Sequence, residues 1–157
     1  MAARDPNMDD GDPVHPEAAV APGYLANHAA RVFNRNVDGV LREHGLSRGL
    51  LAPVLLLAWR GPMRQRDLVA ASAVKQPAMV ALLGKLETMG LIVRTPAPGD
   101  RRAATVTLTE AGERLAAIGG NALRQENGRG LDGFSAEESR TLVALLQRFI
   151  SGLEGGT

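Results

Sequence analysis

The chain has 157 residues, 45% of them hydrophobic, which suits a single domain with a hydrophobic core and a terminal extension. Its net charge of +1 excludes a general attraction to nucleic acid or membrane surfaces. The absence of cysteine excludes disulfides, thiolate catalysis and sulfur ligands for metals, and it suits a reducing compartment.

Charge is unevenly distributed along the chain. Residues 1–22 carry one basic and five acidic side chains, a net of −4, and this segment is expected to be a disordered acidic tail. Residues 60–102 carry eight basic and three acidic side chains, a net of +5, which indicates an anionic partner for the middle of the chain. The N-terminus lacks a signal-peptide pattern and the longest apolar run, residues 50–59, is too short for a bilayer; we expect a cytoplasmic protein with no membrane partner.

Apolar residues at helical spacing predict a first helix over residues 23–45. A second helix is predicted over residues 47–61, with Ser47 as its N-cap and Gly61 as its stop. Pro53 is expected near the first turn of this helix, where its missing N–H does least harm.

Two more helices are predicted over residues 63–74 and 75–90, the second with Pro77 in its first turn and Gly90 at its end. Two runs of strand type follow at residues 91–95 and 104–108, and the segment between them reads as a hairpin loop.

The last two helices are predicted over residues 109–128 and 135–153. Thr109 is the expected N-cap of the first, and Ser135 with Glu138 is expected to form a capping box at the start of the second. An apolar stripe runs along the last helix: Leu142, Leu145, Leu146, Phe149, Ile150 and Leu153.

The order of these elements predicts a mainly α fold. A short helix, a turn, a second helix and a β-hairpin together form a winged helix-turn-helix. The three histidines have no ligand-like spacing, and the phosphate-binding, dinucleotide, nucleophile-elbow and calcium-loop motifs are all absent from the sequence. We therefore expect neither an enzyme nor a cofactor or metal site.

The predicted helix over residues 75–90 has two different faces. Five residues are expected to pack on the core: Met79, Leu82, Leu83, Leu86 and Met89. The opposite face is small and nearly uncharged: Pro77, Val80, Ala81, Gly84 and Thr88. Such a face suits either close approach to a DNA major groove or docking on another part of the protein.

In the DNA-binding reading, methyl groups of Val80 and Ala81 contact thymine methyls, and hydrogen-bonded base reading falls to Gln76 and Lys75. Arg64, Gln65 and Arg66, at the start of the preceding helix, suit phosphate contacts. The residues expected to contact DNA from the two helices are, in full, Arg64, Gln65, Arg66, Lys75, Gln76, Pro77, Val80, Ala81 and Lys85.

The expected hairpin loop, residues 96–103, concentrates charge at its tip. Arg101 and Arg102 are expected to project toward a minor groove, where the negative potential is enhanced. Asp100 is interpreted as a brace that holds Arg102 in one rotamer. The alternative is a solvated surface ion pair of little consequence.

The stretch "LETMGLIVRTPAPGDRRAATVTLTEAG" resembles the signature of the MarR family, the multiple-antibiotic-resistance regulators, and the resemblance runs from about Tyr24 to Leu153. It implies a homodimer, usually a repressor, that binds a pseudo-palindromic operator and responds to a small molecule. Residues 1–22 would then be the tail, 23–46 a dimerisation helix, 47–108 the DNA-binding domain and 109–157 the C-terminal dimerisation helices.

The resemblance also implies roles for single residues. Asp100 becomes the bracing acid and Arg102 the minor-groove arginine, while Ala78, Val80 and Ala81 depart from the polar residues common in the family's recognition helix. An effector such as an aromatic acid is expected in a cleft lined by Tyr24, His28, Arg31, Trp59 and Arg60, although packing or surface roles are the alternative for each. A winged-helix module for protein–protein interaction, without a DNA target, is the rival function.

Overall fold

The structure is a computed structural model that describes residues 16–155 except residue 73 and residues 98–99; the side chains of residues 97 and 100–102 also fall outside the described part. Within it, helices dominate and three strands form one small antiparallel sheet, which confirms the expected mainly α winged fold. The elements are η1 (Ala18–Val20), α1 (Pro22–Glu43), α2 (Arg48–Arg60), β1 (Met63–Arg64), α3 (Gln65–Ala71), α4 (Gln76–Thr88), β2 (Ile92–Ala97), β3 (Asp100–Leu108), α5 (Glu110–Gly130) and α6 (Ala136–Glu154).

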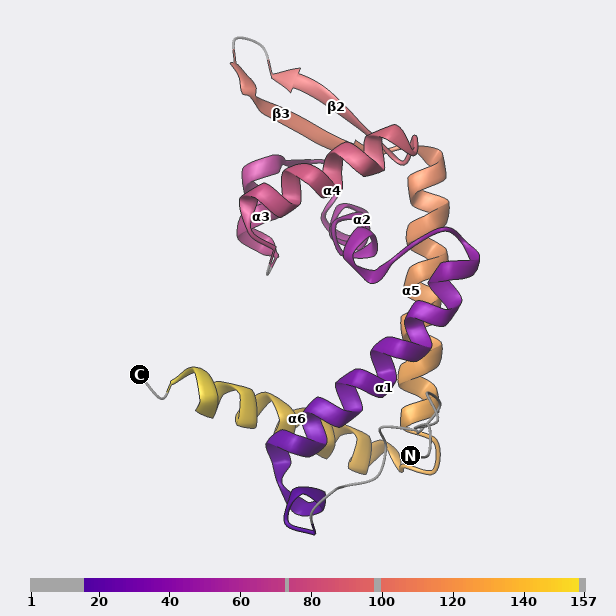
Figure 1. Cartoon of the computed structure of the whole chain (residues 1–157), viewed down its shortest axis with the longest axis vertical. Coiled ribbons are helices and arrows are strands. Elements are labelled where there is room, and N and C mark those ends of the chain that lie inside the picture. Colours follow the sequence, from indigo (N-terminus) through magenta and orange to yellow (C-terminus); the bar gives the residue numbers. More distant parts are fainter. Residues whose placement is uncertain (1–15, 73, 98–99, 156–157) are drawn as a thin grey trace, which may run out of the picture.

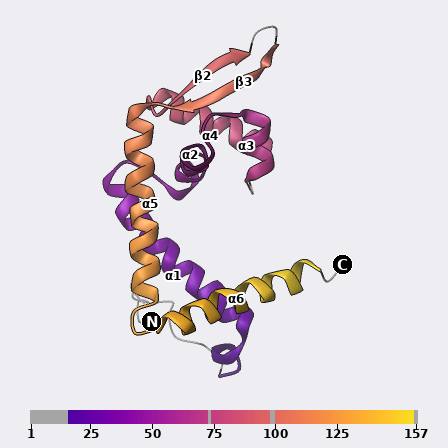
Figure 2. The same cartoon turned by 180° about the vertical axis from the view of Figure 1, so that it is seen from behind.

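The elements form a compact lobe, made of α2, α3, α4 and the three strands, and an arm, made of α1, α5 and α6. Helices α2, α3 and α4 lie beneath the β2–β3 hairpin, while α5 runs from the sheet along α1 to the far end of the molecule, where α6 turns back (Figure 1). The reverse view shows strands β2 and β3 and helix α6 at opposite ends of the molecule (Figure 2). The buried cluster joins residues of α1 through α5, but no residue of α6 is buried. The core therefore belongs to the lobe and its junction with the arm.

Local signals set most helix ends where they were expected. Gly90, at φ 70°, ends α4: its N–H donates to the Glu87 carbonyl and turns the chain toward β2. The Thr109 side chain accepts a hydrogen bond from the Gly112 N–H at the start of α5. Ser135 and Glu138 form the predicted capping box of α6.

Two helix predictions were wrong in detail. The segment predicted as a helix over residues 63–74 begins with strand β1, because Met63 and Arg64 pair with Val106 and Thr105 of β3. Pro53 lies inside α2 rather than near its first turn, since the helix starts at Arg48. Burial of the surrounding leucines stabilises α2 despite the hydrogen bond that this proline cannot make.

The hairpin is longer than predicted. Strands β2 and β3 pair from Ile92–Leu108 to Thr95–Thr105 and, after a register shift, again at Ala97–Asp100. The expected loop over residues 96–103 is therefore mostly strand, and residues 98–99 alone separate the two strands. We call the β2–β3 hairpin the wing. Because strands rise by about 3.3 Å per residue, the longer pairing extends the wing further from the lobe.

Candidate nucleic-acid interface

Helix α4 has the two faces predicted for it. Met79, Leu83 and Leu86 are fully buried and anchor the helix on the core. The opposite face is exposed at Pro77, Val80, Ala81 and Thr88 and half-buried at Gly84. Met89 was expected to pack inward, but it is 39% exposed because it lies beyond the last turn, at the C-cap.

The polar and basic residues of the expected DNA-contacting set lie on β1, α3 and α4. Arg64 is the last residue of β1 and the N-cap residue of α3. Lys75 is the N-cap residue of α4, and both side chains are exposed. Lys85 is exposed on the last turns of α4. These three cations have no acidic partner among the described residues, whereas Arg66 Nε lies 3.5 Å from Asp67 Oδ1. Gln65 is half-buried as the first residue of α3, and Gln76 is exposed as the first residue of α4.

The charged tripeptide of the wing lies at the start of β3. Asp100 pairs with Ala97 across the hairpin, and Arg101 and Arg102 follow it in the strand. Their side chains fall outside the described part of the structure, so the bracing role of Asp100 stays a prediction.

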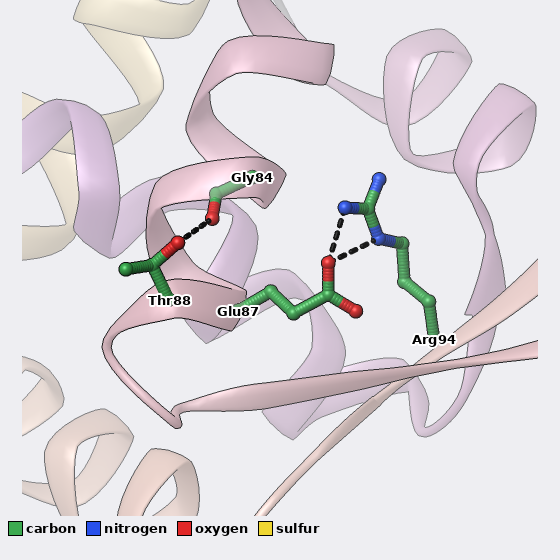
Figure 3. A network of polar contacts seen from close by, with 4 residues as sticks. All are labelled: Gly84, Glu87, Thr88 and Arg94. Carbon is green, nitrogen blue, oxygen red and sulfur yellow. Dashed lines mark hydrogen bonds and ion pairs between the residues drawn. The ribbon is translucent and has the colours of Figure 1, made fainter.

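The wing is joined to α4 by an ion pair that the sequence did not indicate. Arg94 on β2 donates from Nε to Oε2 of Glu87 on α4 at 3.0 Å, and its Nη2 bonds the same oxygen (Figure 3). Hydrogen bonding to the guanidinium, with a smaller contribution from its charge, lowers the pKa of the Glu87 carboxyl below its ordinary value. The same contact raises the pKa of Arg94.

The base of the wing is also tied to α5. The Thr109 hydroxyl donates to the Gly90 carbonyl at 2.7 Å, and the Thr109 N–H donates to the Leu91 carbonyl at 3.0 Å. A Cβ added at Gly112 would lie 2.1 Å from the Leu91 oxygen. The approach of α5 to this turn is therefore so close that only glycine fits at position 112. The start of α5 is therefore held directly against the turn between the end of α4 and the start of β2.

The five residues expected in one ligand cleft fall in two places. Tyr24 and His28 stack on α1 with ring centroids 6.2 Å apart, and Arg31 Nη2 lies 3.4 Å from His28 Nδ1. Trp59 and Arg60 lie at the end of α2, in the lobe. The structure therefore does not bring the two groups together within one chain.

A cavity of about 440 Å³ lies beside Trp59, at the junction of the lobe and the arm. It is formed by the end of α2, the end of β3 and one face of α5, where Glu113 and Arg124 line it. Trp59 is 72% exposed at this site, and Arg60 is not among the lining residues. Arg124 was missed, although its spacing from Glu113, Ala117 and Gly120 places all four on one helical face.

Helix α6 presents the predicted apolar stripe to solvent. Leu145, Leu146, Ile150 and Leu153 are 50%, 42%, 51% and 69% exposed. A helix with so many exposed large apolar side chains has an unfilled packing surface within the single chain.

The exposed helix beside a β-hairpin, on a helical scaffold, defines this chain as a winged helix-turn-helix protein. The family model described as "MarR family" matches residues 54–103, from α2 into the wing. The chain is similar to a probable transcriptional regulator from Pseudomonas aeruginosa, with 27% identity and a TM-score of 0.71 over 83% of this chain and 98% of that chain.

Two further solved structures share the fold. BpsR from Bordetella bronchiseptica, described with regulation of its DNA binding by 6-hydroxynicotinic acid, is 23% identical, with a TM-score of 0.71 over 81% of this chain and 96% of that chain. A mutant MarR from Escherichia coli in complex with operator DNA is 20% identical, with a TM-score of 0.71 over 81% and 91%. The resemblance to the MarR family is therefore confirmed, and the chain has the winged helix fold of MarR-family transcriptional regulators.

In the described residues, no helix has both the length and the apolar character needed to cross a membrane.

Proposed function

We propose that this chain is a homodimeric transcriptional repressor that binds a pseudo-palindromic DNA operator and is released by a small aromatic acid. The observation that carries the proposal is the exposed, uncharged face of α4, with a long wing beside it and three cations nearby in the chain, Arg64, Lys75 and Lys85, that have no acidic partner among the described residues. A major groove admits a helix of this kind, while cations at its margins neutralise phosphates. We propose no catalytic activity.

In this arrangement α4 enters the major groove, and the DNA backbone is contacted by Arg64 at the start of α3 and by Lys75 at the start of α4. Arg66 and Lys85 add positive charge to the same surface. Arg102 reaches the adjacent minor groove from the wing, with Asp100 holding its rotamer. The mutant MarR from Escherichia coli, which has the same fold, was solved with operator DNA, and this supports the DNA-binding part of the proposal.

The homodimer is proposed from the exposed apolar stripe of α6. A second copy of the chain would cover this stripe, and a two-fold pair of lobes would match the two halves of a pseudo-palindrome. The arm formed by α1, α5 and α6 would then be the dimerisation region.

The effector is proposed to bind in the cavity beside Trp59. Apolar walls from α2 and α5 suit an aromatic ring, and Arg124 suits a carboxylate. The regulation of BpsR by 6-hydroxynicotinic acid supports an aromatic acid as the ligand class. Binding between α2, β3 and α5 would act on the wing through the contacts of Thr109 with the α4–β2 turn.

A second function is favoured by one observation, the apolar character of the exposed α4 face. Such a face also suits a protein partner, in which case the chain would be a winged-helix interaction module without a DNA target.

A gel-shift titration with the DNA that flanks the chain's own gene separates the two functions. The repressor proposal expects a shift that competitor DNA of unrelated sequence does not abolish, with an affinity that falls steeply as salt is raised. Arg102→Ala is expected to weaken binding by about 1–3 kcal/mol, whereas Arg114→Ala, on α5, serves as the matched control. A failure to bind this DNA and a random duplex pool alike would favour the interaction module.

A further inference from the structure

We propose that α4 recognises thymine methyl groups, with Val80 and Ala81 as the contacting residues, so that the preferred DNA carries A·T pairs where α4 lies in the major groove. This inference rests on the proposed DNA-binding function and names the class of sequence that the protein selects.

The exposed face of α4 offers carbon atoms in place of hydrogen-bonding groups. Pro77, Ala78, Val80 and Ala81 are all exposed, and Val80 is 44% exposed. Apart from its chain neighbours and the backbone of its own helix, no atom of the described residues lies within 4 Å of a Cβ added at Gly84, so the surface above this residue is open. In the major groove, the C5-methyl of thymine is the feature that apolar side chains recognise.

Two polar residues at the C-terminal end of α4 are already engaged within the protein. The Thr88 hydroxyl donates to the Gly84 carbonyl at 3.0 Å, and Glu87 accepts the hydrogen bonds of Arg94 (Figure 3). For Glu87 to accept from a cytosine amino group, it would have to leave a charge-assisted pair. Hydrogen-bonded reading of G·C pairs from this end of the helix is therefore disfavoured.

Gln76, the one amide side chain of α4, also favours recognition of an A·T pair. Gln76 is exposed at the first turn of α4, and a glutamine amide pairs with the N6 and N7 atoms of adenine. Lys75 and Lys85 lie at the two ends of the helix and have no acidic partner in the described part of the chain, so their charges suit phosphates. Adenine recognition by Gln76 and thymine recognition by Val80 and Ala81 thus agree on A·T pairs.

The test uses the full-length protein and a duplex pool with a random core. Bound duplexes are selected from a pool made with thymine, and the strongest binder is then resynthesised with deoxyuridine, which lacks only the C5-methyl, at each thymine in turn. We expect binding to weaken about fourfold at each contacted thymine, the effect of losing one buried methyl group.

Two variants of α4 test whether this helix recognises the thymine methyl groups. In Val80→Ala and Ala81→Ser, the affinity ratio between thymine and deoxyuridine duplexes is expected to fall toward one at the position that each residue contacts. Val20→Ala serves as the matched control, because Val20 is an exposed valine in η1, away from the lobe, and the wild-type ratio is expected there. Thermal melts of all variants exclude misfolding as the cause.

Two results would overturn the inference while leaving the DNA-binding function intact. One is a wild-type protein that binds thymine and deoxyuridine duplexes equally at every position. The other is a wild-type ratio retained by both Val80→Ala and Ala81→Ser, which would place methyl recognition elsewhere. If the protein enriches no duplex from the pool, the proposed function itself fails, and the inference fails with it.

Discussion

Arg94 of β2 and Glu87 of α4 form a paired contact in which one carboxylate oxygen accepts from both Nε and Nη2 of the guanidinium. The two residues lie on either side of the Gly90 turn, so the contact fixes the direction of the wing relative to the exposed helix face. The side chains are 29% and 40% exposed, and solvent screening therefore limits the contribution of this pair to global stability. Its main effect is on the relative orientation of the two elements that we propose to contact DNA.

The first prediction concerns the pH dependence of this contact. Arg94 lowers the pKa of Glu87 below its ordinary value of 4.5, so the pair stabilises the folded chain above that value and loses this contribution as the pH falls through the lowered pKa. Glu87→Gln should melt at a lower temperature than the wild type at neutral pH, and the difference should shrink in acid. Circular dichroism melts over a pH series measure this.

The matched control for that series is Glu43→Gln, because Glu43 is exposed at the end of α1 and has no ion-pair partner among the described residues. It should melt close to the wild type throughout. A difference between Glu87→Gln and the wild type that stays constant into acid would assign the effect to packing rather than to the charge pair.

The faces of α4 could be predicted from the sequence, because apolar residues at helical spacing determine which side is buried. The contact between Glu87 and Arg94 could not, since it spans a helix end, a turn and a strand whose relative directions depend on tertiary structure. Strand β1 has only two residues, too few for an alternating pattern, and its pairing with β3 is decided by the packed lobe. The cavity beside Trp59 combines three distant segments, so no local pattern indicated it.

The second prediction uses two adjacent glycines of α5 that differ in their surroundings. A Cβ added at Gly119 would lie 2.2 Å from Leu51 Cδ1, and Leu51 is buried in the core. At Gly120 the nearest atom is Arg124 Nη1 at 3.4 Å, the end of a flexible side chain. Gly119→Ala should therefore destabilise the fold by about 1–3 kcal/mol, while Gly120→Ala should be stabilising by up to about 1 kcal/mol.

Denaturant unfolding of the two glycine variants beside the wild type measures both changes. Opposite signs are expected even though the substitutions are chemically identical and one position apart. Equal stabilisation of both variants would mean that Leu51 moves aside without cost and that α2 and α5 do not pack as closely as described.

The third prediction tests the proposed dimer through α6. Leu146→Glu places a charge in the apolar stripe, and burial of an unpaired carboxylate against a partner is strongly unfavourable. The variant should be a monomer at concentrations where the wild type has twice the chain mass in sedimentation equilibrium. Ala144→Glu is the matched control, because it adds the same charge on the opposite side of the same helix and should leave the dimer intact. A monomeric wild type would contradict the proposal.

The fourth prediction concerns the cavity beside Trp59, which is the chain's one tryptophan and therefore reports ligand binding by its fluorescence. Glu113 and Arg124 lie about 16 Å apart along α5, so a carboxylate can pair with Arg124 while remaining distant from Glu113. Benzoate should change the Trp59 emission, and the uncharged benzamide should bind about tenfold more weakly, as expected for loss of a charge-assisted hydrogen bond. Arg124→Gln should bind both compounds equally weakly, whereas Arg114→Gln, on the same helix, should retain the wild-type preference for benzoate. If Arg124→Gln keeps that preference, the carboxylate binds elsewhere, and the pair of Tyr24 and His28 beside Arg31 on α1 becomes the next site to test.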